Sequence, residues 1–134
     1  MLENEGSEIT QGNGEKVLVV DDEPLQREIA TQILEALGYM PEALSCGEEA
    51  VEYMQGHKVD LILLDMIMGT GMNGRETYAR IIEKHPGQKA LIVSGFSENE
   101  EVREALRLGV HAYLQKPYAI SSLSKAVVSA LQAS

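Results

Sequence analysis

Residues 16–24 of the chain read KVLVVDDEP, a short apolar run followed by two acidic residues, Glu23 and a proline. The run is short, apolar and rich in valine, which predicts a buried β-strand. Pro24 suits the first turn of an α-helix, so Asp21 and Asp22 are expected between a strand and a helix. A strand that leads directly into a helix is the repeating unit of an α/β sheet.

The same unit recurs four more times. Further strands are predicted at residues 40–44, 59–64, 89–93 and 110–114. Helices are predicted at residues 24–37, 45–55, 74–85, 97–108 and 121–131, from apolar spacing and helix stops. Capping-box spacing marks two of the helix starts, at Ser45 with Glu48 and at Ser97 with Glu100. Pro41 places the second strand at a sheet edge. Five alternating strands and helices predict a doubly wound parallel sheet.

The bulk composition is typical of one soluble globular domain. The 134 residues are 44% hydrophobic and 24% charged, with a formal net charge of -10. This charge disfavours nucleic acid or an anionic membrane as a direct partner. Cys46 is the only cysteine, so no internal disulfide can form and a cytoplasmic location is expected. Residues 1–14 are acidic and are predicted to be flexible, which leaves residues 15–134 as the folded domain.

Polar residues follow four of the predicted strands, at Asp21 and Asp22, Asp65, Ser94 and Lys116. Open α/β sheets bind ligands beyond the carboxyl ends of their strands, so these groups are expected to meet at one edge. Adjacent carboxylates repel each other in a partly desolvated site, and a hard cation such as Mg2+ removes the conflict. A carboxylate can attack phosphorus to give an aspartyl-phosphate once charge is neutralised. The set therefore suits a cation and a phosphoryl group.

Four segments together resemble the receiver domain of two-component response regulators: VLVVDDEP, LILLDMIM, ALIVSG and AYLQKPY. The resemblance covers about residues 16–131 and depends on the combination and its spacing. It implies a single flavodoxin-like (βα)5 domain with strand order 2-1-3-4-5. It also implies a signal-transduction phosphoprotein that is not an enzyme, beyond catalysing its own phosphorylation and dephosphorylation.

The resemblance also assigns roles to the acidic residues. Asp65 would accept a phosphoryl group from the phosphohistidine of a histidine kinase or a histidine phosphotransfer protein. Mg2+ (or Mn2+) would be bound directly by Asp22, Asp65 and the backbone carbonyl of Ile67, with Asp21 acting through a water. The loop from Asp65 to Gly74 is one residue longer than is usual in the family.

The switch is likewise assigned by resemblance. Ser94 and Lys116 would bind the phosphoryl oxygens. Ser94 would move toward them, and Tyr113 would rotate into the vacated space. The surface of the fourth helix, fifth strand and fifth helix would then change toward a downstream protein target, whose identity the sequence does not give, or toward a phosphorylation-dependent homodimer.

Two other functions compete with this hypothesis. Haloacid-dehalogenase phosphatases also use an aspartate nucleophile after a first strand, but they need a second Asp two residues on. Glu23 holds that position if Asp21 is the nucleophile. The other alternative is a receiver-like interaction module that is never phosphorylated. Phosphate on Asp65, on Asp21 or on neither distinguishes the three.

Two further expectations concern the protein from which this domain comes. The sequence ends shortly after the last predicted helix, so we expect either a free-standing regulator or a receiver from a larger protein. The acidic residues 1–14 and the segment MGTGMNGRETY at residues 68–78 resemble the receivers of hybrid sensor histidine kinases.

Overall fold

The structure is a computed structural model that describes residues 11–69, 71–95 and 98–133. Its strands are β1 (Lys16–Val20), β2 (Met40–Leu44), β3 (Leu61–Asp65), β4 (Ala90–Ser94) and β5 (Ala112–Gln115). Its helices are α2 (Pro24–Ala36), α3 (Gly47–Gly56), α4 (Gly74–Lys84), α5 (Glu100–Leu108) and α6 (Ile120–Gln132). Strands and helices alternate as predicted.

All neighbouring strands pair in parallel, in the order β2-β1-β3-β4-β5. This confirms the doubly wound, flavodoxin-like prediction, including the edge position of β2 with its proline. The chain leaves β1 for β2 on one side and then returns to β3 on the other. The strand order therefore reverses between β1 and β3, which is where such sheets form their binding crevice.

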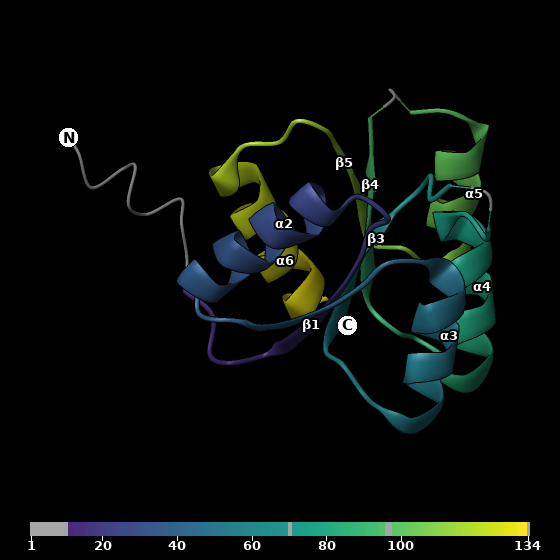
Figure 1. Cartoon of the computed structure of the whole chain (residues 1–134), viewed down its shortest axis with the longest axis horizontal. Coiled ribbons are helices and arrows are strands. Elements are labelled where there is room, and N and C mark those ends of the chain that lie inside the picture. Colours follow the sequence, from purple (N-terminus) through teal and green to yellow (C-terminus); the bar gives the residue numbers. More distant parts are fainter. Residues whose placement is uncertain (1–10, 70, 96–97, 134) are drawn as a thin grey trace.

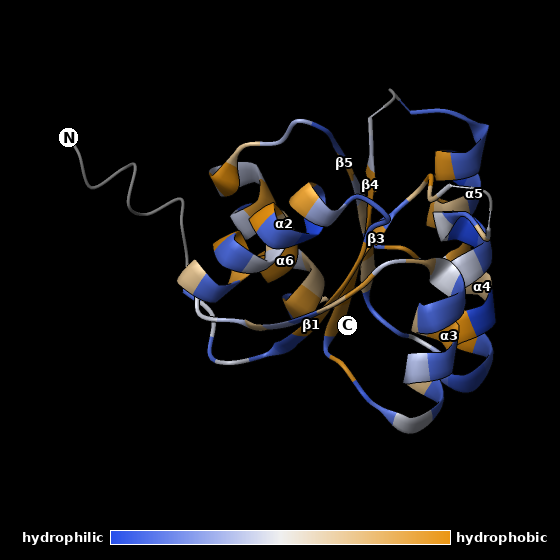
Figure 2. Cartoon of the chain, in the orientation of Figure 1, coloured by the Kyte–Doolittle hydropathy of each residue, from blue (hydrophilic) through white to orange (hydrophobic). Residues whose placement is uncertain are grey.

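Helices cover both faces of the sheet, as Figure 1 shows. Alternate strand residues face opposite sides. Val17 and Val19 of β1 pack with α2 and α6, whereas Leu18 and Val20 pack with α3, α4 and α5. All five residues of β3 are buried, and the central strands carry the hydrophobic colours in Figure 2. The central strands are thus held from both sides, which fixes where their carboxyl ends lie.

Both predicted capping boxes differ from the structure. The N-cap of α3 is Cys46, and the hydroxyl and N–H of Ser45 donate instead to Glu49 Oε1. The N-cap of α5 is Asn99, whose side chain accepts the N–H of Val102. Ser97, proposed as the second cap, lies outside the described residues. Each helix therefore begins later than the S-x-x-E spacing indicated.

The first described residues, 11–14, contact the turn after α2. Among residues 11–14, the N–H of Gly14 donates to the carbonyl of Gly38 at 2.8 Å. Residues 1–10, most of the segment predicted to be flexible, lie outside the described part.

Among the described residues, no helix combines the length and apolar character needed to cross a membrane.

The loop after β3 closes tightly against the strand that it leaves. The N–H of Gly74 donates to the carbonyl of Met66 at 2.7 Å. A Cβ on Gly74 would lie 2.6 Å from the carbonyl oxygen of Asp65, which is closer than atoms can approach. Glycine at position 74 thus lets the start of α4 reach the end of β3.

Replacing Gly74 with alanine should therefore destabilise the domain. We expect Gly74→Ala to lower the free energy of unfolding by about 2 kcal/mol, because backbone atoms must move apart. Gly56→Ala is the matched control: Gly56 also lies in a helix, but a Cβ there meets no atom within 4 Å. Urea unfolding of the two variants measures the difference, and equal stabilities would contradict this account of the loop.

Candidate functional site

Three carboxylates converge at the reversal point of the sheet. Asp21 and Asp22 follow β1, and Asp65 ends β3, which pairs with β1. One oxygen from each lies within 4.8 Å of the others. Asp21 and Asp65 are each only 7% exposed, whereas Asp22 is exposed to solvent. The structure thus brings together the three acids that the sequence analysis singled out, with one side open.

The ammonium group of Lys116 reaches this cluster from the end of β5. Its Nζ lies 3.1 Å from Asp21 Oδ2 and 3.6 Å from Asp65 Oδ1. The Lys116–Pro117 peptide bond is cis, and the N–H of Lys116 donates to the carbonyl of Ser94 at 2.7 Å. This ammonium group therefore contacts two acids and is closer to Asp21 than to Asp65.

Arg27 is a site residue that the sequence analysis missed. Its Nη1 donates to the backbone carbonyl of Asp21 at 2.7 Å, and Asp21 Oδ1 accepts the N–H of Glu23 at 3.0 Å. These bonds fix the turn between β1 and α2. Arg27 is one residue among several charged ones on α2, so no spacing rule distinguishes it.

Burial and like charge dominate the electrostatics of Asp65. Burial, with the neighbouring carboxylate of Asp21, raises its pKa to about 7, although Lys116 partly opposes the shift. Burial alone would lower the pKa of Lys116, but Asp65 and Asp21 outweigh it, so the pKa is raised. The cluster combines three carboxylates with one close ammonium. An all-oxygen donor set with excess negative charge fits a hard divalent cation such as Mg2+ or Mn2+.

The remaining predicted residues lie on the adjacent strands and loop. Ser94 ends β4 and is 1% exposed; the preceding residue, Val93, pairs with Asp65. Tyr113 lies on β5, half-buried, and packs on the face covered by α3, α4 and α5. The side chain of Ile67, two residues after Asp65, is 51% exposed. The roles of these residues as phosphoryl ligand, switch and carbonyl ligand remain predictions.

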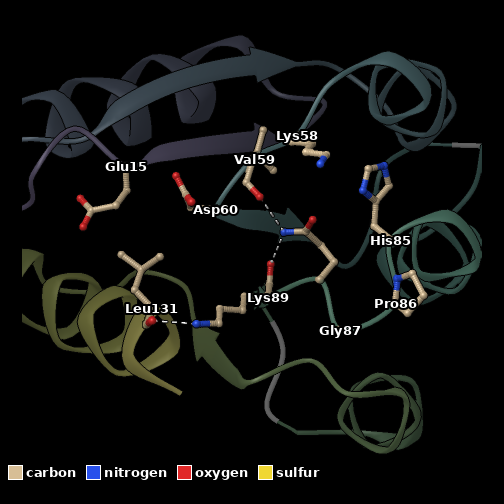
Figure 3. Close-up of a pocket in the computed structure, with 10 residues that line it drawn as sticks. Glu15, Lys58, Val59, Asp60, His85, Pro86, Gly87, Lys89 and Leu131 are labelled. Carbon is tan, nitrogen blue, oxygen red and sulfur yellow. Dashed lines mark hydrogen bonds between the residues drawn. The ribbon is translucent and has the colours of Figure 1, made fainter. Parts of the chain in front are cut away.

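A hollow of about 430 Å³ lies elsewhere, at the amino ends of the strands (Figure 3). Two of its polar groups are bound within the chain: Lys89 Nζ donates to the carbonyl of Leu131 at 2.7 Å, and Asp60 Oδ2 accepts the N–H of Lys16 at 2.8 Å. None of the predicted site residues lines this hollow. The chemistry-bearing residues therefore gather at the opposite end of the sheet.

Comparison with known families agrees with this geometry. The model of the response regulator receiver domain matches residues 17–128. This chain belongs to the response regulator receiver domain family. The receiver domain is 28% identical over 118 residues to the chemotaxis protein CheY of Halobacterium salinarum, covering 88% of this chain and 98% of CheY.

Other relatives are longer proteins. The receiver domain is 30% identical over 104 residues to the transcriptional regulatory protein ComA of Bacillus subtilis, covering 75% of this chain and 49% of ComA. It is 30% identical over 118 residues to the sensor kinase CckA of Brucella abortus, covering 87% of this chain and 12% of CckA. This chain thus corresponds to about half of ComA and to a small part of CckA.

Among solved structures, this chain is similar to the receiver domain of sensor histidine kinase PA1611 from Pseudomonas aeruginosa. That structure is described with a magnesium ion coordinated in its active site cleft. The TM-score is 0.81 at 21% identity, covering 90% of this chain and 99% of that one. At this level of identity the similarity supports the shared fold.

The raised pKa of Asp65 predicts a pH-dependent stability. The folded state binds this proton more tightly than the unfolded state, so the native protein loses stability as pH rises from about 4 to 7. Asp65→Asn removes the titration. With a chelator present to remove cations, the free energy of unfolding of Asp65→Asn minus that of the wild type should increase by about 2 kcal/mol between about pH 5 and pH 8. Urea unfolding measures it; an advantage independent of pH would contradict the assignment.

Proposed function

We propose that this receiver domain accepts a phosphoryl group on Asp65 from a phosphohistidine donor in a two-component relay. The observation that carries the proposal is the convergence of Asp65 with two further carboxylates and with Lys116, 3.6 Å away. Asp65 ends the fully buried strand β3, so its carboxylate is held in place. Asp22 is exposed, so the site is open to solvent on this side.

The acidic cluster is proposed to hold Mg2+, with Mn2+ as a substitute. Asp22, Asp65 and the carbonyl of Ile67 would bind it directly, and Asp21 would act through a water. When bound, the cation would neutralise the charge that opposes attack by a carboxylate on a phosphoryl group. The magnesium ion described for the PA1611 receiver supports this assignment.

The chain's own residues supply the remaining steps. An oxygen of Asp65 forms the new P–O bond as the P–N bond to the donor imidazole breaks. Lys116 shifts from the Asp65 carboxylate to a phosphoryl oxygen, and the hydroxyl of Ser94 donates to another. Tyr113 rotates into the space that Ser94 leaves. Phosphorylation, which adds about 1.5 to 2 negative charges, thereby biases the α5, β5 and α6 surface toward its active form.

The same chemistry serves either parent architecture. CheY, which this chain matches almost end to end, and the sensor kinase CckA, of which it matches a small part, both contain a segment similar to this chain. In each setting the domain acts as a phosphoacceptor rather than as an enzyme that turns over a separate substrate. A free-standing regulator would bind its target through the switched surface, and a hybrid kinase would pass the group to a phosphotransfer protein.

Phosphorylation with a small-molecule donor tests the acceptor assignment. We expect acetyl phosphate with Mg2+ to add one acid-labile phosphoryl group to Asp65, detected by intact mass and peptide mapping. Asp65→Asn should remain unmodified, and chelator should abolish the reaction in the wild type. Phosphate on Asp21 would favour a dehalogenase-type hydrolase, and no modification together with no response to beryllofluoride would favour a non-phosphorylated interaction module.

The donor protein is proposed to dock on α2 and the start of α6. Leu25 and Ile29 on α2 are 64% and 38% exposed, and Ile120 is 50% exposed. A hollow of about 350 Å³ between α2 and the β5–α6 loop is lined partly by Ile29 and Lys116. Because the donor imidazole must reach Asp65, its protein must cover this face. Exposed apolar side chains beside the acceptor suit a helical partner surface.

A charge placed on this surface should separate docking from chemistry. We expect Ile29→Asp to slow phosphotransfer from a phosphohistidine protein by about tenfold or more, while labelling by acetyl phosphate is unchanged. Leu108→Asp on α5 is the matched control, because Leu108 is also 38% exposed but lies on the opposite face of the sheet. Equal transfer rates for the two variants would contradict docking on α2.

A further inference from the structure

The loop between β3 and α4 runs between two carboxylates. On one side, Gly69 has a φ of 63°, and a Cβ placed there would lie 3.5 Å from Asp22 Oδ2. On the other side, the N–H of Met72 donates to Glu48 Oε2 at 3.0 Å. Among the described residues of this loop, Gly69 thus passes near Asp22, and Met72 is hydrogen-bonded to helix α3.

The contact with α3 is close. A Cβ on Gly71 would lie 2.7 Å from Glu48 Oε2, so the loop backbone passes directly against this carboxylate. Helices α3 and α4 lie side by side (Figure 1), and a Cβ on Gly47 would overlap Thr77 Oγ1 of α4. The first turn of α3 is therefore fitted against the end of the loop and the beginning of α4.

The carboxylate of Glu48 is suited to this contact. It lies in the first turn of α3, where the helix dipole favours negative charge. The N–H of Met72 lowers its pKa, so it stays ionised. A hydrogen bond to an ionised acceptor is stronger than one between neutral groups.

We propose that Glu48 is a positioning residue for the phosphoacceptor site, holding the β3–α4 loop against Asp22 through the amide of Met72. The inference depends on the cation site of the proposed function. The loop carries Ile67, whose carbonyl is the proposed third ligand, and eight residues separate the end of β3 from the start of α4. A longer loop has more conformations to lose on closing, so an anchor at its far end matters more.

Without this anchor, the Met72 amide would hydrogen-bond to water and the loop would gain freedom. The ligands of the cation would then be less well preorganised, which weakens binding without removing any carboxylate of the cluster. Glu48 acts through the loop and contacts neither the cation nor the phosphoryl group. Its effect is therefore expected on Mg2+ affinity while the three acids remain intact.

Three variants separate anchoring from charge. Glu48→Ala removes the acceptor and the charge, Glu48→Gln keeps an acceptor oxygen, and Glu49→Ala removes a neighbouring charge that accepts from Ser45 instead of the loop. By calorimetry, we expect Glu48→Ala to raise the Mg2+ dissociation constant about three- to tenfold and Glu48→Gln, which keeps a weaker acceptor, to raise it less, with Glu49→Ala within about twofold of the wild type. Equal weakening by Glu48→Ala and either of the others would show a charge effect and overturn the proposal.

Amide hydrogen exchange without Mg2+ tests the anchor directly. The Met72 amide should exchange faster in Glu48→Ala and at the wild-type rate in Glu49→Ala. An unchanged rate in Glu48→Ala would overturn the proposal. If the wild type binds Mg2+ and Glu48→Ala binds it equally well, the role of Glu48 is wrong and the cation site stands. If the wild type binds no Mg2+, the cation site is wrong and the role of Glu48 fails with it.

Discussion

Repulsion among three carboxylates at the reversal point of the sheet is the constraint on which the site depends. Asp21 and Asp65 are nearly buried, at the ends of neighbouring strands that are packed from both faces. They cannot move apart without breaking the strand pairing or the core. The charge must therefore be offset locally, by Lys116, by a proton on Asp65 or by a bound cation. This need is the physical basis of the proposed response of the site to a cation and to phosphorylation.

The surrounding structure fixes these groups through the backbone as much as through side chains. Gly74 allows α4 to begin against the carbonyl of Asp65, and Arg27 binds the carbonyl of Asp21. The main chain that carries the acids is thus held on both strands. The clustered charges destabilise the fold, and the hydrophobic packing on both faces of the sheet compensates for this loss of stability. Functional sites commonly depend on their scaffold in this way.

The sheet and the acids could be predicted because they depend on local sequence. The apolar runs of β1 and β3 specify buried strands, and an acid directly after such a run must lie at the strand end. The caps could not be predicted: Cys46 and Asn99 begin helices that spacing assigned to Ser45 and Ser97. Which residue becomes the cap depends on where the preceding strand and loop place the chain, and this is a tertiary effect.

The difference between local and tertiary effects also explains why the contacts around the acids were less predictable than the positions of the acids themselves. Lys116 was predicted to approach an anion, but its closer contact with Asp21 depends on the geometry of strands brought together across the sheet. Since one ammonium contacts two carboxylates, its departure toward a phosphoryl group would leave Asp21 less compensated. A cation held nearby would then be needed more in the phosphorylated state than in the free one, so binding of the two should be mutually favourable.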